Sequence, residues 1–232
     1  MIFDGHSDIF SDVRYKREAG ETQVLKNHHL DRLRKGGIGG ACFVIWADTY
    51  NGHAPKDEME AIVKGIKGEM AETKEFVLIH NVEELKAAEA AGKFAILLGI
   101  EGLAGIGEDL SKIDELYDLG ARHAMLTWNE ENALATGVKG DPNRGVTELG
   151  KQAIKKLQEK KMILDVSHIN EKSFWDVIDL ATGPILASHS NAKALASAAR
   201  NLTDDQLRAI RDTNGLVGLN AFGDFISDNK AE

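Results

Sequence analysis

The sequence predicts an α/β fold in which parallel strands alternate with helices. Short apolar runs recur along the chain, and amphipathic segments separate them. Most of these runs are almost continuously apolar, which is typical of strands covered on both faces. No Pro-rich or Ser-rich linker interrupts the alternation. We therefore expect βαβ units with a parallel sheet, in a single domain that spans residues 1–232.

Seven strands are expected from the apolar runs. They lie at Ile2–Asp8, Ile38–Ala47, Phe94–Glu101, His123–Asn129, Met162–His168, Pro184–Ser190 and Leu216–Phe222.

Apolar residues at helical spacing predict helices between these strands. Such stripes occur at 61–70, 154–157, 177–181 and 207–210. Thr203 with Gln206 three residues later is a capping-box pattern, which predicts a helix that continues to about Asp212. Asn214 and Gly215 then end that helix and lead into the last strand.

Composition and charge exclude several classes of protein. Hydrophobic residues make up 43% of the chain and charged residues 28%, which is ordinary for a globular protein and rules out bulk disorder. The net charge of −9 argues against nucleic-acid partners and against an anionic membrane surface. Cys42 is the only cysteine, so an intramolecular disulfide is impossible. The sequence has no secretory signal and no apolar stretch of about 18 residues, so the expected location is the cytoplasm.

Two common catalytic motifs are missing from the sequence. There is no phosphate-binding P-loop and no GxSxG nucleophile elbow. The glycines at 36–40 do not complete a dinucleotide fingerprint, because Cys42 stands where the last glycine belongs. Nucleotide binding and serine-hydrolase chemistry therefore have no support.

The candidate functional residues lie where predicted strands end. They are His6, Asp8, Glu101, His168 and His189. The carboxyl ends of parallel strands face the ligand in barrels and open sheets, so these side chains are expected to converge. His6 and Asp8 are two residues apart and point to the same face of their strand. Imidazole and carboxylate ligands without a thiolate suit zinc or a similar divalent ion.

The sequence resembles the renal or membrane dipeptidases, a zinc-dependent family with an amidohydrolase-type barrel. The resemblance covers nearly the whole chain, from Met1 to about Phe222. It rests on five stretches taken in order: Asp4–Asp8, Gly99–Gly102, Leu164–His168, Ser188–Ala192 and Arg200–Asp204.

The resemblance implies a (β/α)8 barrel that binds two zinc ions and hydrolyses dipeptides. His6 and Asp8 would hold one ion, His168 and His189 the other, and Glu101 would bridge both as the catalytic carboxylate. A hydroxide between the ions would be the nucleophile. Arg200 matches the family arginine that receives the substrate carboxylate, and a guanidinium pairs well with that group. The implied partner is a small dipeptide, and a homo-oligomer is compatible with the sequence.

Two departures from the family pattern qualify these expectations. Trp128 follows Leu126-Thr127, where many members carry a histidine that assists the reaction, so Trp128 is expected to contact substrate instead. The family aspartate at the end of an eighth strand has no match, and that strand is missing from the predicted set. We therefore expect the natural chain to continue past Glu232.

Two alternative functions remain open at this stage. One is another amidohydrolase-type reaction on a lactone, phosphotriester or cyclic amide, which the same ligands would serve. The other is a catalytically impaired metal-binding homologue, which Trp128 and the missing strand would explain.

Overall fold

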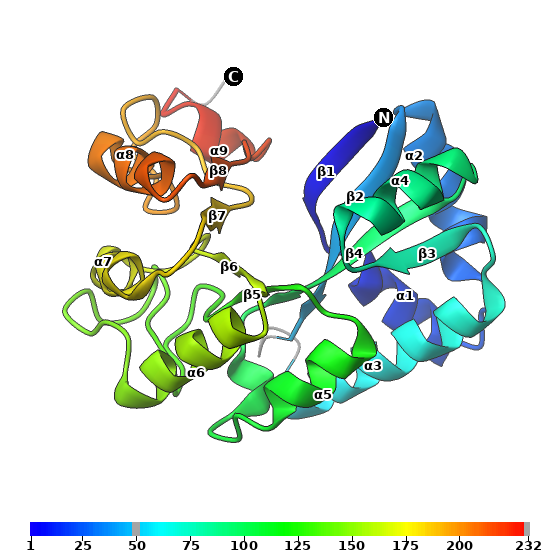
Figure 1. Cartoon of the computed structure of the whole chain (residues 1–232), viewed down its shortest axis with the longest axis horizontal. Coiled ribbons are helices and arrows are strands. Elements are labelled where there is room, and N and C mark those ends of the chain that lie inside the picture. Colours follow the sequence, from blue (N-terminus) through cyan, green and yellow to red (C-terminus); the bar gives the residue numbers. More distant parts are fainter. Residues whose placement is uncertain (48–51, 230–232) are drawn as a thin grey trace. The chain divides into compact units, whose positions relative to one another are not determined.

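The computed structural model describes residues 1–47 and 52–229, and the expected continuation past Glu232 lies outside them. Parallel strands alternate with helices as predicted (Figure 1). Contacts divide the chain into two compact units. The first comprises Met1–Glu101 with Asp114–Arg122, and the second comprises Gly102–Ile113 with His123–Glu232.

The first unit holds a four-stranded parallel sheet in the order β1-β2-β4-β3. Its strands are β1 Ile2–Ser7, β2 Ile38–Trp46, β3 Phe76–Ile79 and β4 Phe94–Glu101. Its helices are α1 Ile9–Glu18, a π-helical turn Leu25–Leu30, α2 Asp31–Lys35, α3 Pro55–Glu72 and α4 Val82–Ala90. Helix α5, Lys112–Leu119, begins at the boundary of the two units.

Aromatic side chains form the centre of the first unit's core. Phe10 of α1 packs edge-on against Phe43 of β2, with 5.5 Å between ring centroids. Phe94 of β4 stacks on Phe43 and also contacts Phe76 of β3. Cys42, which precedes Phe43 on β2, is also buried. This packing fixes α1 against the sheet, and α1 begins directly after the strand end that carries His6.

The second unit holds a parallel sheet in the order β5-β6-β7-β8. Its strands are short: β5 His123–Met125, β6 Ile163–Asp165, β7 Ile185–Ala187 and β8 Leu216–Val217. Its helices are α6 Glu148–Glu159, α7 Glu171–Leu180, α8 Asp204–Asp212 and α9 Gly223–Ile226, with a 3-10 turn at Ala104–Ile106. The predicted capping box of Thr203 and Gln206 is present at the start of α8.

The predicted strands need two corrections. The described residues contain eight strands rather than seven, because β3 was not expected between the second and third predicted strands. The last four strands also end earlier than predicted. In β6, the Asp165 carboxylate accepts the Ser167 N–H at 2.8 Å, which turns the chain out of the sheet. After β8, the Asn220 side chain accepts the Phe222 N–H and leads into α9.

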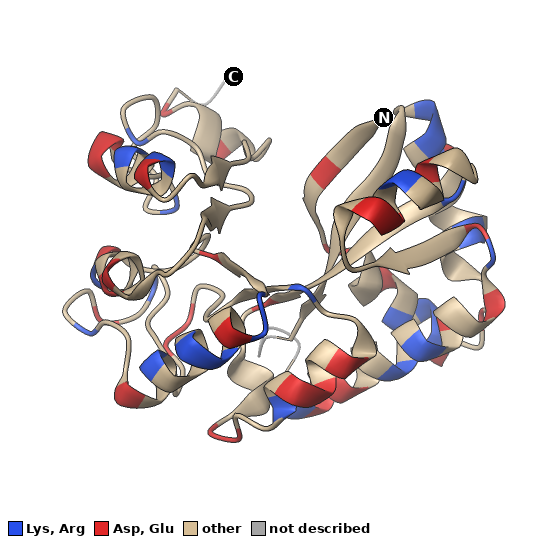
Figure 2. Cartoon of the chain, in the orientation of Figure 1, with Lys and Arg blue, Asp and Glu red and all other residues tan. Residues whose placement is uncertain are grey.

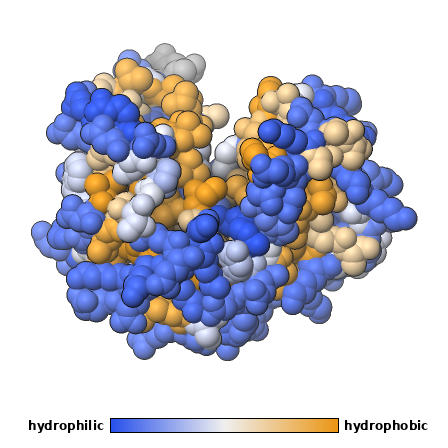
Figure 3. Space-filling view, in the orientation of Figure 1, coloured by the Kyte–Doolittle hydropathy of each residue, from blue (hydrophilic) through white to orange (hydrophobic). Residues whose placement is uncertain are grey.

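Charged residues of both signs are mixed along the helices, while the strands are largely uncharged (Figure 2). Hydrophobic surface remains on β1 and around β8 and α9 (Figure 3). Ile2 is 57% exposed on β1, and Leu219 is 84% exposed after β8. No helix in the described part of the chain combines the length and apolar character that a membrane crossing requires.

Candidate functional site

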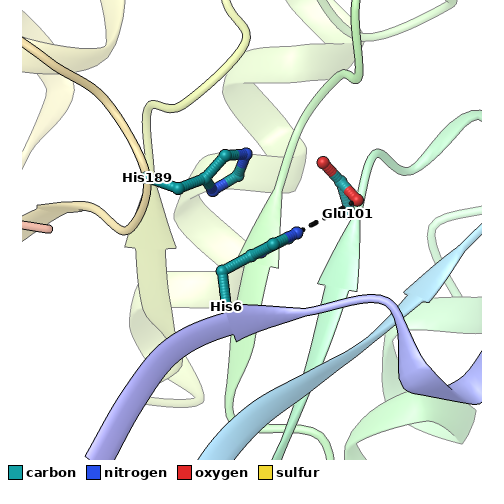
Figure 4. Close-up of side chains that lie close together, drawn as sticks. All are labelled: His6, Glu101 and His189. Atoms are coloured by element: carbon teal, nitrogen blue, oxygen red, sulfur yellow. Dashed lines mark ion pairs between the residues drawn. The ribbon is translucent and has the colours of Figure 1, made fainter. Parts of the chain in front are cut away.

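Three of the predicted ligands gather at the strand ends of the first unit. His6 lies near the end of β1, Asp8 follows that strand, and Glu101 is the last residue of β4. His6 Nε2 lies 3.5 Å from Asp8 Oδ1 and 3.4 Å from Glu101 Oε2. Figure 4 shows the His6 ring directed at the Glu101 carboxylate, with the ion pair as a dashed line. The parallel register of β1, β2 and β4 brings these ends together.

Burial and charge perturb the titration of His6 and Glu101. Burial by itself would lower the pKa of His6, but the hydrogen bonds and charges of Asp8 and Glu101 raise it to about 10. Burial raises the pKa of Glu101 to about 7, although His6 opposes that shift. The carboxylates of Asp8 and Glu101 therefore favour the protonated, positively charged form of His6. The same arrangement of one imidazole and two carboxylates suits a divalent cation.

The other two predicted ligands lie together in the second unit. His168 is the third residue after β6, and His189 is the second residue after β7. Their Nε2 atoms are 2.7 Å apart, and both residues are buried. Two imidazole nitrogens this close together can serve as ligands of one metal ion.

His168 has an unusual backbone conformation. Its φ angle is +75°, which residues other than glycine rarely adopt. The neighbouring loop holds this conformation, because the Val138 N–H donates to the His168 carbonyl at 2.9 Å and the Asn170 N–H donates to Thr136. Strain of this kind persists where surrounding contacts enforce it, and it is common at functional sites.

Each histidine of the second unit has a partner at its other ring nitrogen. Asn129 Oδ1 lies 2.9 Å from His168 Nδ1, and Ser188 Oγ lies 2.8 Å from His189 Nδ1. Such contacts orient the ring of a histidine ligand and leave Nε2 directed at the metal position.

A buried carboxylate supports the backbone before both histidines. Asp165 accepts hydrogen bonds from the Ser167 N–H and the Ser188 N–H, and it lies 2.7 Å from His123 Nε2. Burial would raise the pKa of Asp165, but the hydrogen bond and charge of His123 outweigh it and hold the pKa well below its usual range. The carboxylate thus ties together β5, β6 and the segment that follows β7.

Gly218 packs directly against the segment that carries His189. Its N–H donates to the Ala187 carbonyl, and its own carbonyl accepts the Ser190 N–H. A Cβ atom at position 218 would collide with the carbonyl oxygen of Ser188. The backbone around His189 therefore requires a residue without a side chain at this position.

The two predicted substrate residues lie beside these histidines in the second unit. Arg200 is 7% exposed, and its guanidinium donates to the His189 carbonyl at 3.3 Å and to Ser190 Oγ at 3.5 Å. The Trp128 ring lies 6.1 Å from the His168 ring, centroid to centroid. Both side chains are thus placed next to a predicted metal ligand of their own unit.

The structure adds four residues that the sequence analysis did not single out: His123, Asn129, Asp165 and Ser188. His123 was given no role, although it is buried and lies against Asp165. Sequence signals existed for two of them. Ser188 directly precedes His189, and Asp165 lies in the same short motif as His168. Asn129 carried no such signal, because its contact depends on a loop.

Comparisons with known proteins identify the family of this chain. A family model described as membrane dipeptidase, peptidase family M19, matches residues 1–232. A protein of Acinetobacter calcoaceticus, encoded near PQQ genes, is 31% identical over 94% of this chain. A dipeptidase of Schizosaccharomyces pombe is 29% identical over 97% of this chain.

Solved structures give the same result. One is a metallopeptidase of Rhodobacter sphaeroides, solved with a phosphinate mimic of the dipeptide L-Ala-D-Ala. It superposes on this chain with a TM-score of 0.87 at 27% sequence identity, and the match covers 98% of this chain and 75% of the Rhodobacter chain. The probable dipeptidase PvdM of Pseudomonas aeruginosa gives 0.80 at 26% identity, over 87% of this chain. The chain spans 79% of the Acinetobacter protein, 60% of the yeast dipeptidase and 55% of PvdM.

These matches confirm the predicted α/β fold of the TIM-barrel type, which this chain shares with metallopeptidases. The chain belongs to the membrane dipeptidase family, peptidase family M19.

Proposed function

We propose that this chain hydrolyses dipeptides in a metal-dependent reaction. The observation that carries the proposal is the donor chemistry at the strand ends of a chain in this family. One unit presents an imidazole with two carboxylates, and the other presents two imidazoles whose Nε2 atoms meet. Family membership and the dipeptide mimic bound by the Rhodobacter relative support a dipeptide as the substrate.

We further propose that the five predicted ligands bind two zinc ions. His6 and Asp8 would hold one ion, His168 and His189 the other, and Glu101 would bridge them. These residues fit the group, because nitrogen and carboxylate donors without sulfur suit zinc. When bound, the ions supply a hydroxide nucleophile at neutral pH and polarise the peptide carbonyl.

The chain's own residues would select and orient the substrate. Arg200 would pair with the terminal carboxylate of the dipeptide, which restricts the reaction to very short peptides. Its bond to the His189 carbonyl couples the position of that carboxylate to the segment that carries a ligand. Trp128 would contact the substrate beside His168. Orientation of this kind removes much of the entropic barrier to reaction.

A panel of substrates with added zinc tests the proposal. Dipeptides, including those with a D-residue at the second position, are compared with lactones, phosphotriesters and cyclic amides. Elemental analysis of the zinc-loaded protein is expected to find close to two equivalents of metal. Turnover of another substrate class without turnover of dipeptides would overturn the proposal, as would the absence of bound metal.

Replacing Arg200 by alanine is expected to lower kcat/KM for dipeptides by about 10- to 150-fold. The reason is the loss of one charge-assisted pair, which contributes roughly 1.5–3 kcal/mol. Metal content is expected to stay unchanged. Steady-state kinetics provides the measurement, and Arg208→Ala on the exposed face of α8 is the matched control. Unaltered kinetics in Arg200→Ala would exclude contact between this side chain and the substrate.

A further inference from the structure

Two asparagines lie in the stretches that carry the family resemblance and have no part in the proposed chemistry. Asn191 follows His189 by two residues, and Asn201 directly follows Arg200. Both are buried, at 8% and 3% exposure. Their side-chain nitrogens donate to the same acceptor, the Phe225 carbonyl, at 3.0 and 2.9 Å. Two buried amide groups thus fix the backbone of one residue in α9.

The other contacts of these asparagines define which amide atom faces α9. Asn191 Oδ1 accepts the Asn220 N–H at 2.8 Å, and its nitrogen also donates to the Asn220 carbonyl. The nitrogen of Asn201 also donates to the Ala196 carbonyl. Carbonyl oxygens only accept hydrogen bonds, so the nitrogen of each amide must face them. The backbone of Phe225 is therefore held from two separate segments of the second unit.

The Phe225 side chain lies against the arginine that is predicted to bind substrate. The guanidinium carbon of Arg200 lies over the Phe225 ring, 5.6 Å from its centre. Arg200 also donates to the His189 carbonyl at 3.3 Å and to Ser190 Oγ at 3.5 Å, which are long distances for hydrogen bonds. The face of an aromatic ring attracts a guanidinium without accepting the in-plane N–H groups that pair with a carboxylate. Contact with the ring is therefore compatible with carboxylate binding.

We propose that Phe225 is a positioning residue for Arg200, and that Asn191 and Asn201 hold its backbone in place for this task. A long arginine side chain loses much rotamer freedom when it is fixed. A contact that fixes the guanidinium before the substrate arrives lowers the entropic cost of binding the terminal carboxylate. The proposal rests on the proposed function, since it takes Arg200 as the group that receives this carboxylate.

Replacing Phe225 by leucine is expected to raise KM for dipeptides by about 3- to 30-fold and to leave kcat within about twofold. The terminal carboxylate does not change during hydrolysis, so it is bound equally in the ground state and the transition state, and its loss appears in KM. Phe225→Met also lacks the ring, fills the space with a flexible chain, and is expected to act in the same way. Phe225→Tyr keeps the ring and is expected to retain the KM of the unaltered chain.

Two comparisons separate the positioning of Arg200 from general support of the fold. In an Arg200→Ala background, Phe225→Leu is expected to raise KM no further, because the two changes affect one interaction. For dipeptides whose terminal carboxylate is replaced by an amide, Phe225→Leu is expected to leave KM unchanged. A ring that only supported the fold would raise KM in both comparisons.

Phe222→Leu is the matched control. It makes the same chemical change at the residue before α9, in a ring that lies 5.0 Å from the Phe225 ring and is 58% exposed. We expect its KM to match that of the unaltered chain.

Nuclear magnetic resonance of the Arg200 guanidinium gives a readout that needs no turnover. Protons near the face of an aromatic ring are shifted by its ring current, so the Arg200 resonances are expected to move in Phe225→Leu and to move much less in Phe222→Leu. Resonances that stay in place in Phe225→Leu would exclude the contact and overturn the proposal.

The kinetic outcomes distinguish failure of the positioning role from failure of the proposed function. Unchanged KM in both Phe225→Leu and Phe225→Met, in a chain that hydrolyses dipeptides, would overturn the positioning role alone. An equal rise in KM for the free dipeptide and its amide would do the same. An unaltered chain that hydrolyses no dipeptide would overturn the proposed function, and the positioning role with it.

Discussion

Replacing Glu101 by glutamine is expected to lower dipeptide turnover by about a thousandfold and to reduce the metal content. Glu101 is 4% exposed and lies 3.4 Å from His6, so its charge acts in a poorly solvated place. An amide of the same size keeps the shape of the side chain but removes the negative charge that would bridge two cations. A loss of about 4 kcal/mol of charge stabilisation corresponds to that factor in rate.

The measurement combines kcat with elemental analysis of the same preparation. Glu60→Gln on the exposed side of α3 is a matched control, because it makes the same chemical change far from His6 in sequence and is 61% exposed. Full metal content with undiminished turnover in Glu101→Gln would contradict a bridging role. Loss of metal with an unchanged unfolding transition would support it.

Replacing Asp165 by alanine is expected to reduce the free energy of unfolding by about 3–5 kcal/mol. The change leaves His123 buried without its carboxylate and removes the acceptor for the Ser167 and Ser188 N–H groups. Asp165→Asn keeps an oxygen acceptor but not the charge, so a smaller loss is expected. Urea unfolding provides the measurement, with Asp179→Ala on the exposed face of α7 as the control.

The same residue predicts how stability depends on pH. The pKa of Asp165 is lower in the folded protein than in the unfolded chain. The contribution of Asp165 to the free energy of unfolding is therefore complete above its pKa in the unfolded chain, which is about 4. That contribution is lost as the pH falls through its pKa in the folded protein. In Asp165→Asn, the free energy of unfolding is expected to lack the part that depends on protonation of Asp165. An Asp165→Ala variant as stable as the unaltered chain would show that the carboxylate is not a support.

The parallel fold could be predicted because its strands are apolar runs of clear pattern. The strand β3, Phe76–Ile79, could not, because an apolar run of four residues is equally compatible with the end of a helix. The lengths of β5–β8 were overestimated for a related reason. The predicted strand continues past Asp165 through Val166, but the hydrogen bonds of the Asp165 side chain redirect the backbone, and a hydrophobicity pattern does not register them.

The candidate ligands could be predicted because they depend on topology alone. His6 and Glu101 lie at the ends of β1 and β4, which flank β2 in one sheet, and the parallel register brings these ends together independently of loop conformation. The partners of the histidines depend on loop conformation instead. Asn129 lies in the loop after β5 and contacts His168, whose backbone has a positive φ, and no local sequence pattern specifies either the contact or that angle.

The close packing of Gly218 against Ser188 has a consequence for how this sequence can vary. Position 218 lies 29 residues after His189 and supplies no ligand, and Gly218 belongs to a segment outside the stretches that carry the family resemblance. Any side chain there would push on the Ser188 carbonyl and so displace the histidine that follows. Sequence drift at position 218 is therefore restricted by the backbone around His189, so a glycine that is not itself a proposed ligand is expected to tolerate substitution as poorly as the proposed ligand it supports.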